Sequence, residues 1–362
     1  MADFNHINKF LRLLLYPLSL LYGVITWARN RLYDQGILTE IEFDIPTIAV
    51  GNLSVGGTGK TPHVEYLIRL LVRQYHVATL SRGYNRETRG YLFADEDATA
   101  LTIGDEPMLF HLHYDVAVGV GERRALALPQ LLMDAPDTEI VLLDDAFQHR
   151  SIKPGMNIMI TEYRHLFTRD HIVPFGRLRE NRKGYHRADC MIVSKCPENM
   201  DGAEKKRLLE EIRPLPHQRI FFTRLKYGAC YQMLSGEKDF ILPDSRVILA
   251  CGIANPVPLL DYLRTLAQDV RLLRFPDHHY FSSVDLDKME DALAQLGEGF
   301  KMIVTTEKDA VRLALLEEEI VSRKLTLFVV PLEIGFLFGE REAFDDYIFN
   351  FVNYARIAQF NT

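Results

Sequence analysis

Cysteine is scarce in this 362-residue chain. The four cysteines, Cys190, Cys196, Cys230 and Cys251, form no CxxC pair and are too few for a disulfide framework, which indicates a reducing, cytoplasmic environment. Positive net charge is also lacking: the formal charge is −7 at pH 7, which argues against a general nucleic-acid-binding protein. Apolar residues, in contrast, make up 48% of the chain, enough for a sizeable core, and the length favours two domains.

Long hydrophobic runs are missing as well, with one partial exception near the amino terminus. Residues 13–28 contain no charged side chain, and four basic residues flank them: Lys9, Arg12, Arg29 and Arg31. A transmembrane helix needs about 20 apolar residues, so this run is short, and it includes Pro17 and the aromatic residues Tyr16, Tyr22 and Trp27. We therefore expect residues 1–35 to form a helix that lies in the membrane interface. A buried core helix and a signal peptide are the alternatives, although no small-residue cleavage site follows.

The most informative motif starts at Ile48, where an apolar run is followed by a glycine-rich turn. The turn consists of Ser54, Val55, Gly56, Gly57, Thr58, Gly59, Lys60 and Thr61. Its glycines let backbone N–H groups point at phosphate, Lys60 can reach the β- and γ-phosphates, and the Thr61 hydroxyl can bind Mg²⁺. Ser54 replaces the first glycine of the usual phosphate-loop pattern. A chance glycine-rich turn is the alternative, but the strand before it and the helical apolar spacing after it favour a phosphate loop.

A second signal for a nucleotide site is the apolar run 140–143, which ends in Asp144 and Asp145. Phosphate-loop enzymes hold Mg²⁺ through carboxylates at a strand end, directly or through water. Acidic residues can instead cap the helix that follows a strand. Because the pair occurs together with a phosphate loop, we expect a nucleotide as co-substrate, Mg²⁺ as cofactor, and Thr61, Asp144 and Asp145 in the metal region.

Apolar runs alternate with helical stretches along most of the chain. This pattern predicts an α/β fold, a phosphate-loop NTPase-like and mostly parallel sheet flanked by helices, with ligands beyond the carboxyl ends of the strands. We expect residues 36–219 to form this domain. Residues 220–240 contain two short extended segments and predict a hinge. The pattern restarts in residues 241–362, which predicts a second, smaller α/β domain that ends in an amphipathic helix.

Four further segments contain residues suited to phosphoryl transfer or to contact with an anionic substrate. Asp105 lies in a segment that resembles a turn, and His278 follows a strand of the second domain; each can be a general base or only a turn residue. Arg82 directly follows a strand and is a candidate phosphate contact. Residues 164–187 contain seven Arg or Lys against two acidic residues. This excess fits contact with an anionic substrate or lipid headgroups, or a solvated loop.

Seven motifs together closely resemble those of the tetraacyldisaccharide 4′-kinase family, the lipid A 4′-kinases. They are residues 50–54, 56–62, 81–84, 104–107, 144–149, 176–180 and 277–278. The resemblance spans nearly the whole chain and the combined set is specific, whereas the phosphate loop alone indicates only a nucleotide enzyme. Ala146 departs from the glycine more familiar after the paired aspartates, with little consequence for the chemistry.

The resemblance implies a membrane-associated kinase of lipid A and lipopolysaccharide biosynthesis, which transfers the γ-phosphate of ATP to the 4′-hydroxyl of a tetraacylated glucosamine disaccharide 1-phosphate. It implies a peripheral or monotopic protein at the cytoplasmic face of the inner membrane, with inner-membrane lipids as partners, two α/β/α domains and a short two-stranded linker. We expect no nucleic acid and no obligate protein partner. By resemblance, Lys60 acts on phosphate and Asp105 with His278 forms the base, while substrate contacts fall on Arg82, His149, Arg179 and Glu180.

A membrane-associated switch ATPase without a lipid acceptor is the alternative from a different class. The phosphate loop of those proteins has the form KGGxGKT, and its opening lysine would fall on Val55. The absence of that lysine favours the kinase.

Overall fold

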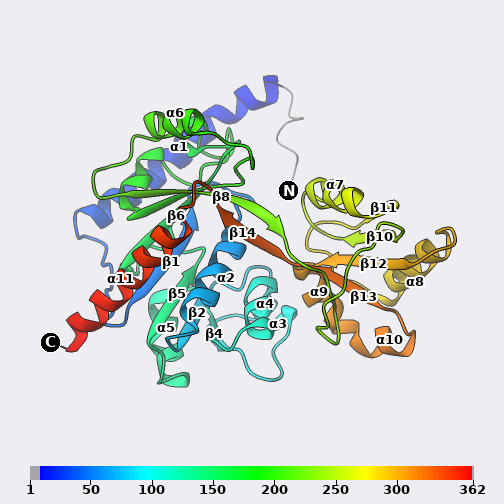
Figure 1. The fold of residues 1–362 in the computed structure, drawn as a ribbon. Coiled ribbons are helices and arrows are strands. Elements are labelled where there is room, and N and C mark those ends of the chain that lie inside the picture. The colour runs from blue at the N-terminus through cyan, green and yellow to red at the C-terminus, as the bar shows by residue number, and fades with distance from the viewer. Residues whose placement is uncertain (1–8, 361–362) are drawn as a thin grey trace.

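The computed structural model describes residues 9–360 of the chain, with side chains from residue 15 to residue 357. Its fourteen strands form one large and one small sheet, which lie apart in Figure 1 with β8 and β14 running between them. The large sheet has nine strands in the order β14-β8-β7-β6-β1-β5-β2-β4-β3. The bounds of its strands are β1 Thr47–Asn52, β2 Val77–Ser81, β3 Leu92–Phe93, β4 Ala117–Val120, β5 Ile140–Asp144, β6 Met156–Glu162, β7 Cys190–Ser194, β8 Arg219–Tyr227 and β14 Leu332–Phe336.

The large sheet is mostly parallel: only the β3/β4 and β8/β14 pairs at its two edges are antiparallel. Its central strand, β1, lies between β5 and β6 and is buried throughout, as expected for a parallel strand covered on both faces. The accompanying helices are α1 Lys9–Asp34, α2 Lys60–Leu71, α3 Ala100–Ile103, α4 Asp105–His113, α5 Arg124–Asp134, α6 Gly202–Ile212 and α11 Arg341–Phe360. The predicted fold class, a mostly parallel sheet flanked by helices, is confirmed.

The small sheet has five strands in the order β11-β10-β12-β13-β9. Its elements are β9 Tyr231–Gln232, β10 Arg246–Cys251, β11 Asp269–Arg274, β12 Lys301–Thr306 and β13 Leu327–Val330, with α7 Val257–Leu266, α8 Ser283–Ala294, α9 Glu307–Leu313 and α10 Glu317–Ser322. All pairs are parallel except β13/β9. Apolar clusters on both faces of this sheet give it a core of its own.

The chain crosses between the sheets twice, through strands that pair with each other. β8 belongs to the large sheet, where it pairs with β7, and its far end pairs antiparallel with β14, with Tyr227 opposite Leu332. The return strand β14 lies outside the segment 220–240 in which the sequence predicts the hinge. A hinge strand is hard to predict when its partner lies about a hundred residues away, because only tertiary pairing identifies it.

The C-terminal helix α11 packs on the large sheet, so the prediction that assigned it to the second domain is wrong. Its buried residues Phe344, Ile348 and Val352 share a cluster with β1 and α2. Tyr66 of α2 also donates a hydrogen bond to Asp345 (2.6 Å). The amphipathic pattern predicts that this helix has a buried face, but not which of two apolar surfaces that face covers.

Helix α1 packs on the large domain through small polar residues. Ser19 donates to the Ile172 carbonyl (2.6 Å), and a side chain at Gly23 would meet Ile172, so the helix approaches closely there. Its large side chains remain exposed, including Leu21 and Trp27, which are 60% and 59% exposed. Among the described residues, none of the helices combines the length and apolarity needed to cross a bilayer.

Candidate active site

The glycine-rich turn joins the central strand β1 to helix α2, as the sequence predicts. Gly56 and Gly59 have φ of +104° and +89°, a region where a Cβ atom causes strain, so glycine suits both positions. Lys60 and Thr61 open α2, where unpaired backbone N–H groups and the helix dipole favour an anion. The segment before the glycines is held by backbone bonds with residues 177–179, among them Val55 N–H to the Arg177 carbonyl (2.7 Å).

Side chains from neighbouring strands fix the shape of this turn. The amide of Asn52 donates to the Thr58 hydroxyl (2.8 Å), and the Ser194 hydroxyl donates to the Thr58 carbonyl (2.7 Å). Lys195 donates to the carbonyl of Gly57 (2.5 Å). Ser194 and Lys195 lie at the end of β7 and were not predicted, because nothing local in the sequence marks them as partners of a turn more than 130 residues away.

The turn is also tied to the strand that leads toward the small sheet. His63 Nδ1 donates to the Gly59 carbonyl (2.6 Å), and Nε2 accepts from the Thr223 hydroxyl of β8 (3.0 Å). Burial lowers the pKa of His63 to about 4, so the ring is neutral and can make both bonds. Through His63, these two hydrogen bonds link Gly59, whose backbone is in the left-handed region, to β8.

The two predicted aspartates lie at the end of β5, beside the glycine-rich turn. Asp145 pairs with Lys60 (Oδ1 to Nζ, 3.4 Å) and with Arg179 (Oδ2 to Nη1, 3.1 Å). Burial opposes ionisation of Asp145, but Lys60 and Arg179 outweigh it and hold its pKa below the ordinary value. Burial, followed by repulsion from Asp145, raises the pKa of Asp144 to about 7. The positive charge beside the two carboxylates is thus too small to keep both of them ionised.

The structure brings Asp105 and His278 together, although they are 173 positions apart in the sequence. His278 Nδ1 donates to Asp105 Oδ2 (3.0 Å), which leaves Nε2 as the nitrogen able to accept a proton. The hydrogen bond to Asp105 raises the pKa of His278 above its ordinary value, against the effect of burial. Asp105 is the first residue of α4 and is 3% exposed, whereas His278 follows β11 and has φ of +57°.

Helix α9 holds these two residues from the small-sheet side. Arg312, which is 1% exposed, lies 3.5 Å from Asp105 and 3.2 Å from Asp309, and it donates to the His279 carbonyl (2.9 Å). One turn earlier, Lys308 donates to Glu106 (2.5 Å). Neither basic residue was predicted, since both depend on contacts between the two halves of the chain.

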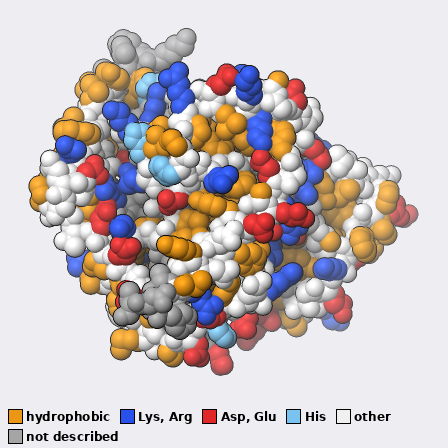
Figure 2. Space-filling model, turned by 60° about the vertical axis from the view of Figure 1, so that its left-hand side comes forward, with side chains coloured by type: hydrophobic (Ala, Val, Ile, Leu, Met, Phe, Trp, Pro, Cys, Tyr) orange, Lys and Arg blue, Asp and Glu red, His pale blue; other side chains and the backbone are white. Residues whose placement is uncertain are grey.

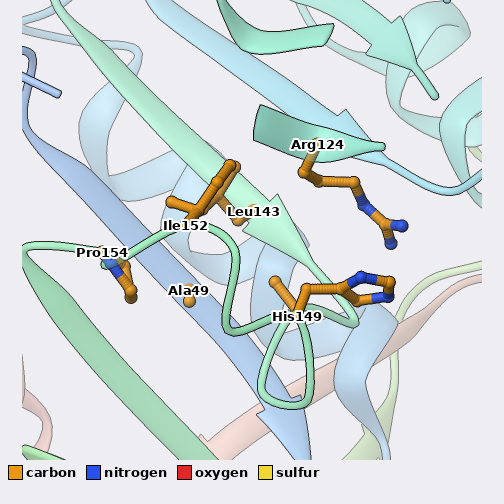
Figure 3. A pocket seen from close by; sticks show the side chains of 7 residues that line it. Ala49, Arg124, Leu143, His149, Ile152 and Pro154 are labelled. Atoms are coloured by element: carbon orange, nitrogen blue, oxygen red, sulfur yellow. The ribbon is translucent and has the colours of Figure 1, made fainter. Parts of the chain in front are cut away.

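His149 and Arg124 line a small hollow behind the aspartate pair. Figure 3 shows their side chains extending to the same side, past the apolar residues Leu143 and Ile152. Burial, and then the charge of Arg124, lowers the pKa of His149 to about 4. Arg124 is 1% exposed, and its Nε and Nη2 atoms have no hydrogen-bond partner among the described residues. Arg124 is a further residue that the sequence did not reveal; it is the first residue of α5, four positions after the end of β4.

Arg82 and Glu180 have contrasting surroundings. Arg82 is exposed and lines a groove of about 550 Å³ with Tyr84, Asn85 and Arg86. Glu180 is 1% exposed: one oxygen accepts from Arg187 and the other from the Asn30 amide of α1 (2.6 Å). These contacts occupy the Glu180 carboxylate within the protein, whereas Arg82 faces open space.

Comparison with known families identifies this arrangement. The family model of tetraacyldisaccharide-1-P 4′-kinase matches residues 11–353. The chain belongs to this family. It is 40% identical over 353 residues to a tetraacyldisaccharide 4′-kinase of Bacteroides thetaiotaomicron, covering 93% of this chain and 92% of the relative. It is 42% identical to the one of Flavobacterium johnsoniae, covering 94% and 97%.

A solved structure of the same family has the same architecture. The crystal structure of the "apo" form of LpxK from Aquifex aeolicus in complex with ATP is 27% identical in sequence, with a TM-score of 0.73. The match covers 94% of this chain and 99% of that one. As a member of the tetraacyldisaccharide 4′-kinase family, the chain is a kinase, and the alternative of a switch ATPase is not favoured.

Proposed function

We propose that this kinase transfers the γ-phosphate of ATP to the 4′-hydroxyl of a tetraacylated glucosamine disaccharide 1-phosphate. The observation that carries the proposal is the Asp105–His278 hydrogen bond. It joins a carboxylate on the phosphate-loop side of the molecule to an imidazole on the small-sheet side. Phosphoryl transfer to a sugar requires a group that takes the hydroxyl proton, and this pair can supply one.

ATP fits the glycine-rich turn from Ser54 to Thr61, where backbone N–H groups, Lys60 and the start of α2 offer positive charge to its phosphates. The family structure from Aquifex aeolicus is described as a complex with ATP, which supports this assignment. Lys60 would stabilise the charge that develops on the transferred phosphate, and its bond to Asp145 positions its ammonium group.

Mg²⁺ fits the donor set beside this turn. Thr61, Asp144 and Asp145 supply a hydroxyl and two carboxylates, the oxygen ligands that Mg²⁺ prefers. The raised pKa of Asp144 reflects a buried carboxylate pair that Lys60 only partly compensates, and a bound cation would remove that imbalance. When bound, the ion would neutralise charge on the β- and γ-phosphates.

His278 would accept the 4′-hydroxyl proton on Nε2, while Asp105 holds the ring through Nδ1 and stabilises its charged form. We propose that residues 36–219 and residues 241–331 form two domains. The Asp105–His278 base then lies at their junction. For the acceptor we propose Arg82 and Arg179 as contacts, because cationic groups near the site suit an anionic sugar phosphate. We also propose His149, whose neutral ring can form a hydrogen bond with the sugar. Glu180 is assigned a positioning role, since Arg187 and Asn30 hold its carboxylate.

We propose that α1 places the enzyme on the cytoplasmic face of the inner membrane as a peripheral or monotopic protein. Its small polar residues face the protein and its large apolar residues face outward, which is the reverse of an ordinary surface helix. On the side of the molecule that carries α1, Figure 2 shows apolar side chains among basic ones, a combination suited to anionic lipid. Inner-membrane lipids are then partners, and we propose no nucleic acid and no obligate protein partner.

A transfer assay tests this proposal. With γ-labelled ATP, Mg²⁺ and the tetraacylated disaccharide 1-phosphate, we expect labelled lipid from the native protein. Lys60→Ala and Asp144→Asn should remove transfer without unfolding the protein. Release of inorganic phosphate with no labelled lipid would instead identify a switch ATPase.

A further inference from the structure

A second cluster of titratable side chains lies between the two sheets and plays no part in the proposed reaction. Glu65 belongs to α2, His113 is the last residue of α4, and Glu307 is the first residue of α9. One ligand atom from each, a carboxylate oxygen or an imidazole nitrogen, lies within 4.8 Å of the other two. Three helices from both halves of the chain therefore direct metal-binding groups at one point.

Each of these groups is oriented by a further contact, as is usual for metal ligands. The Tyr114 hydroxyl donates to Glu65 (3.0 Å), and the Leu332 N–H donates to Glu307 Oε2 (3.0 Å). His113 Nδ1 faces Glu307 Oε1 at 3.7 Å, while its other nitrogen, Nε2, lies 3.4 Å from the Tyr231 hydroxyl. The second nitrogen of a metal-bound histidine commonly has such a partner.

The carboxylates of this cluster have no direct Lys or Arg partner among the described residues. Among the described residues, Lys and Arg nitrogens all lie more than 4.0 Å from the Glu65 and Glu307 carboxylates. The nearby Arg69 directs its guanidinium to the Tyr114 hydroxyl instead (3.3 Å). Two carboxylates and an imidazole therefore meet at this point, and the carboxylates have no direct ion pair with Lys or Arg among the described residues, an arrangement that suits a bound cation.

We propose that Glu65, His113 and Glu307 form a binding site for one divalent transition-metal ion that joins α2 and α4 to α9. One imidazole and two carboxylates form a ligand set suited to Zn²⁺ or Mn²⁺, and the histidine disfavours Mg²⁺. The site is separate from the Mg²⁺ region at Asp144 and does not depend on the proposed function. An ion there would fix the small-sheet half of the chain against the phosphate-loop half.

Metal titration of the full chain tests this site without measuring activity. Metal-free protein is titrated with Zn²⁺ against a chromophoric chelator, and its thermal midpoint is measured with Zn²⁺ and with Mg²⁺. We expect one tightly bound Zn²⁺ per chain and a rise in the midpoint with Zn²⁺ that is lost in Glu65→Gln, whereas any rise with Mg²⁺, through the Asp144 region, should be the same in that variant. Glu65→Gln, which keeps the size of the side chain, and His113→Ala should each weaken Zn²⁺ binding at least about tenfold, the scale of losing a supporting group.

Two further variants separate ligation from general damage. His111→Ala lies on the same helix outside the cluster and should bind Zn²⁺ as the native protein does, whereas Tyr231→Phe should weaken binding about tenfold through His113. With Co²⁺ as probe, the native protein should show a visible absorption band that Glu65→Gln changes. Absence of stoichiometric Zn²⁺ in the native protein, or equal Zn²⁺ binding by folded Glu65→Gln and His113→Ala, would overturn the proposal and leave two carboxylates that share a proton.

Discussion

Replacing Asp105 by Asn should lower turnover and also change its dependence on pH. In the native protein, Asp105 accepts the Nδ1 hydrogen of His278 at 3.0 Å, and this bond raises the pKa of the imidazole. A base with a raised pKa is protonated, and therefore inactive, at any pH below that value, so kcat falls as pH is lowered through it. Asn keeps the size of the side chain but removes the charge, so the pKa of His278 should fall.

The size of this change follows from the contact. A hydrogen bond to a charged group is worth about 1.5–3 kcal/mol, and one pKa unit corresponds to about 1.36 kcal/mol, so the acid limb should move by about one to two units. The lower figure is expected because His278 is partly exposed. This acid limb, the part of the profile where kcat falls as pH is lowered, moves toward lower pH because the pKa of His278 falls. At pH values above the pKa of His278 in both proteins, where kcat no longer depends on pH, kcat of the variant should still be lower than that of the native protein by roughly 10²–10⁴, the usual range for general-base assistance.

The assay is initial-rate transfer of labelled phosphate to the lipid acceptor between pH 5 and 9, with both substrates saturating. Asp97→Asn, at an exposed acidic residue shortly before α3, is the matched control and should leave the profile unchanged. Asp105→Asn combined with His278→Ala should be little worse than His278→Ala alone, because the two groups act as a unit. Multiplicative losses, or an acid limb that stays in place in Asp105→Asn, would refute the pairing.

Three other predictions concern membrane binding, positioning and stability. Trp27→Asp should weaken vesicle binding by about 1.5–3 kcal/mol, whereas Met133→Asp, at an exposed position of α5, should not; equal sedimentation of both variants with vesicles would show that α1 does not contact lipid. Arg312→Lys should lower kcat about tenfold and leave the KM for ATP unchanged, because one ammonium group cannot reach both Asp105 and the His279 carbonyl. A rise of about tenfold in the KM for ATP would contradict this positioning role. Phe344→Ala should lower the free energy of unfolding by about 3–5 kcal/mol in chemical denaturation; a change below about 1 kcal/mol would contradict the packing of α11 on the large sheet.

The phosphate loop could be predicted from sequence because its determinants are local. A strand, two glycines with positive φ and the start of a helix fall within fourteen residues, and each of these features favours particular residue types. The aspartates at the end of β5 are predictable for the same reason, because an apolar run followed by acidic residues marks a strand end. Adjacent parallel strands then bring both motifs to one edge of the sheet.

The contacts that hold the site together could not be predicted in this way. Arg312, Lys308 and Ser194 each act across more than 130 positions in the sequence, and as single residues they resemble ordinary surface or capping groups. In the sequence, only the family resemblance links Asp105 with His278 as a pair. The residues around this pair, including the buried Arg312, can be identified only from the three-dimensional structure. The same holds for α11, whose apolar face fits either sheet by pattern alone.

Helix α9 links the proposed metal region with the proposed base. Lys308 contacts Glu106, the neighbour of Asp105, and its charge also acts on Asp144 of the proposed metal region. Arg312, one turn later, contacts Asp105 directly and holds the backbone of the His278 loop. The small sheet therefore reaches the phosphate-loop half through the same helix that positions the base. A change that loosens α9 should lower kcat while ATP still binds, because the glycine-rich turn is held by β7 and β8 rather than by α9.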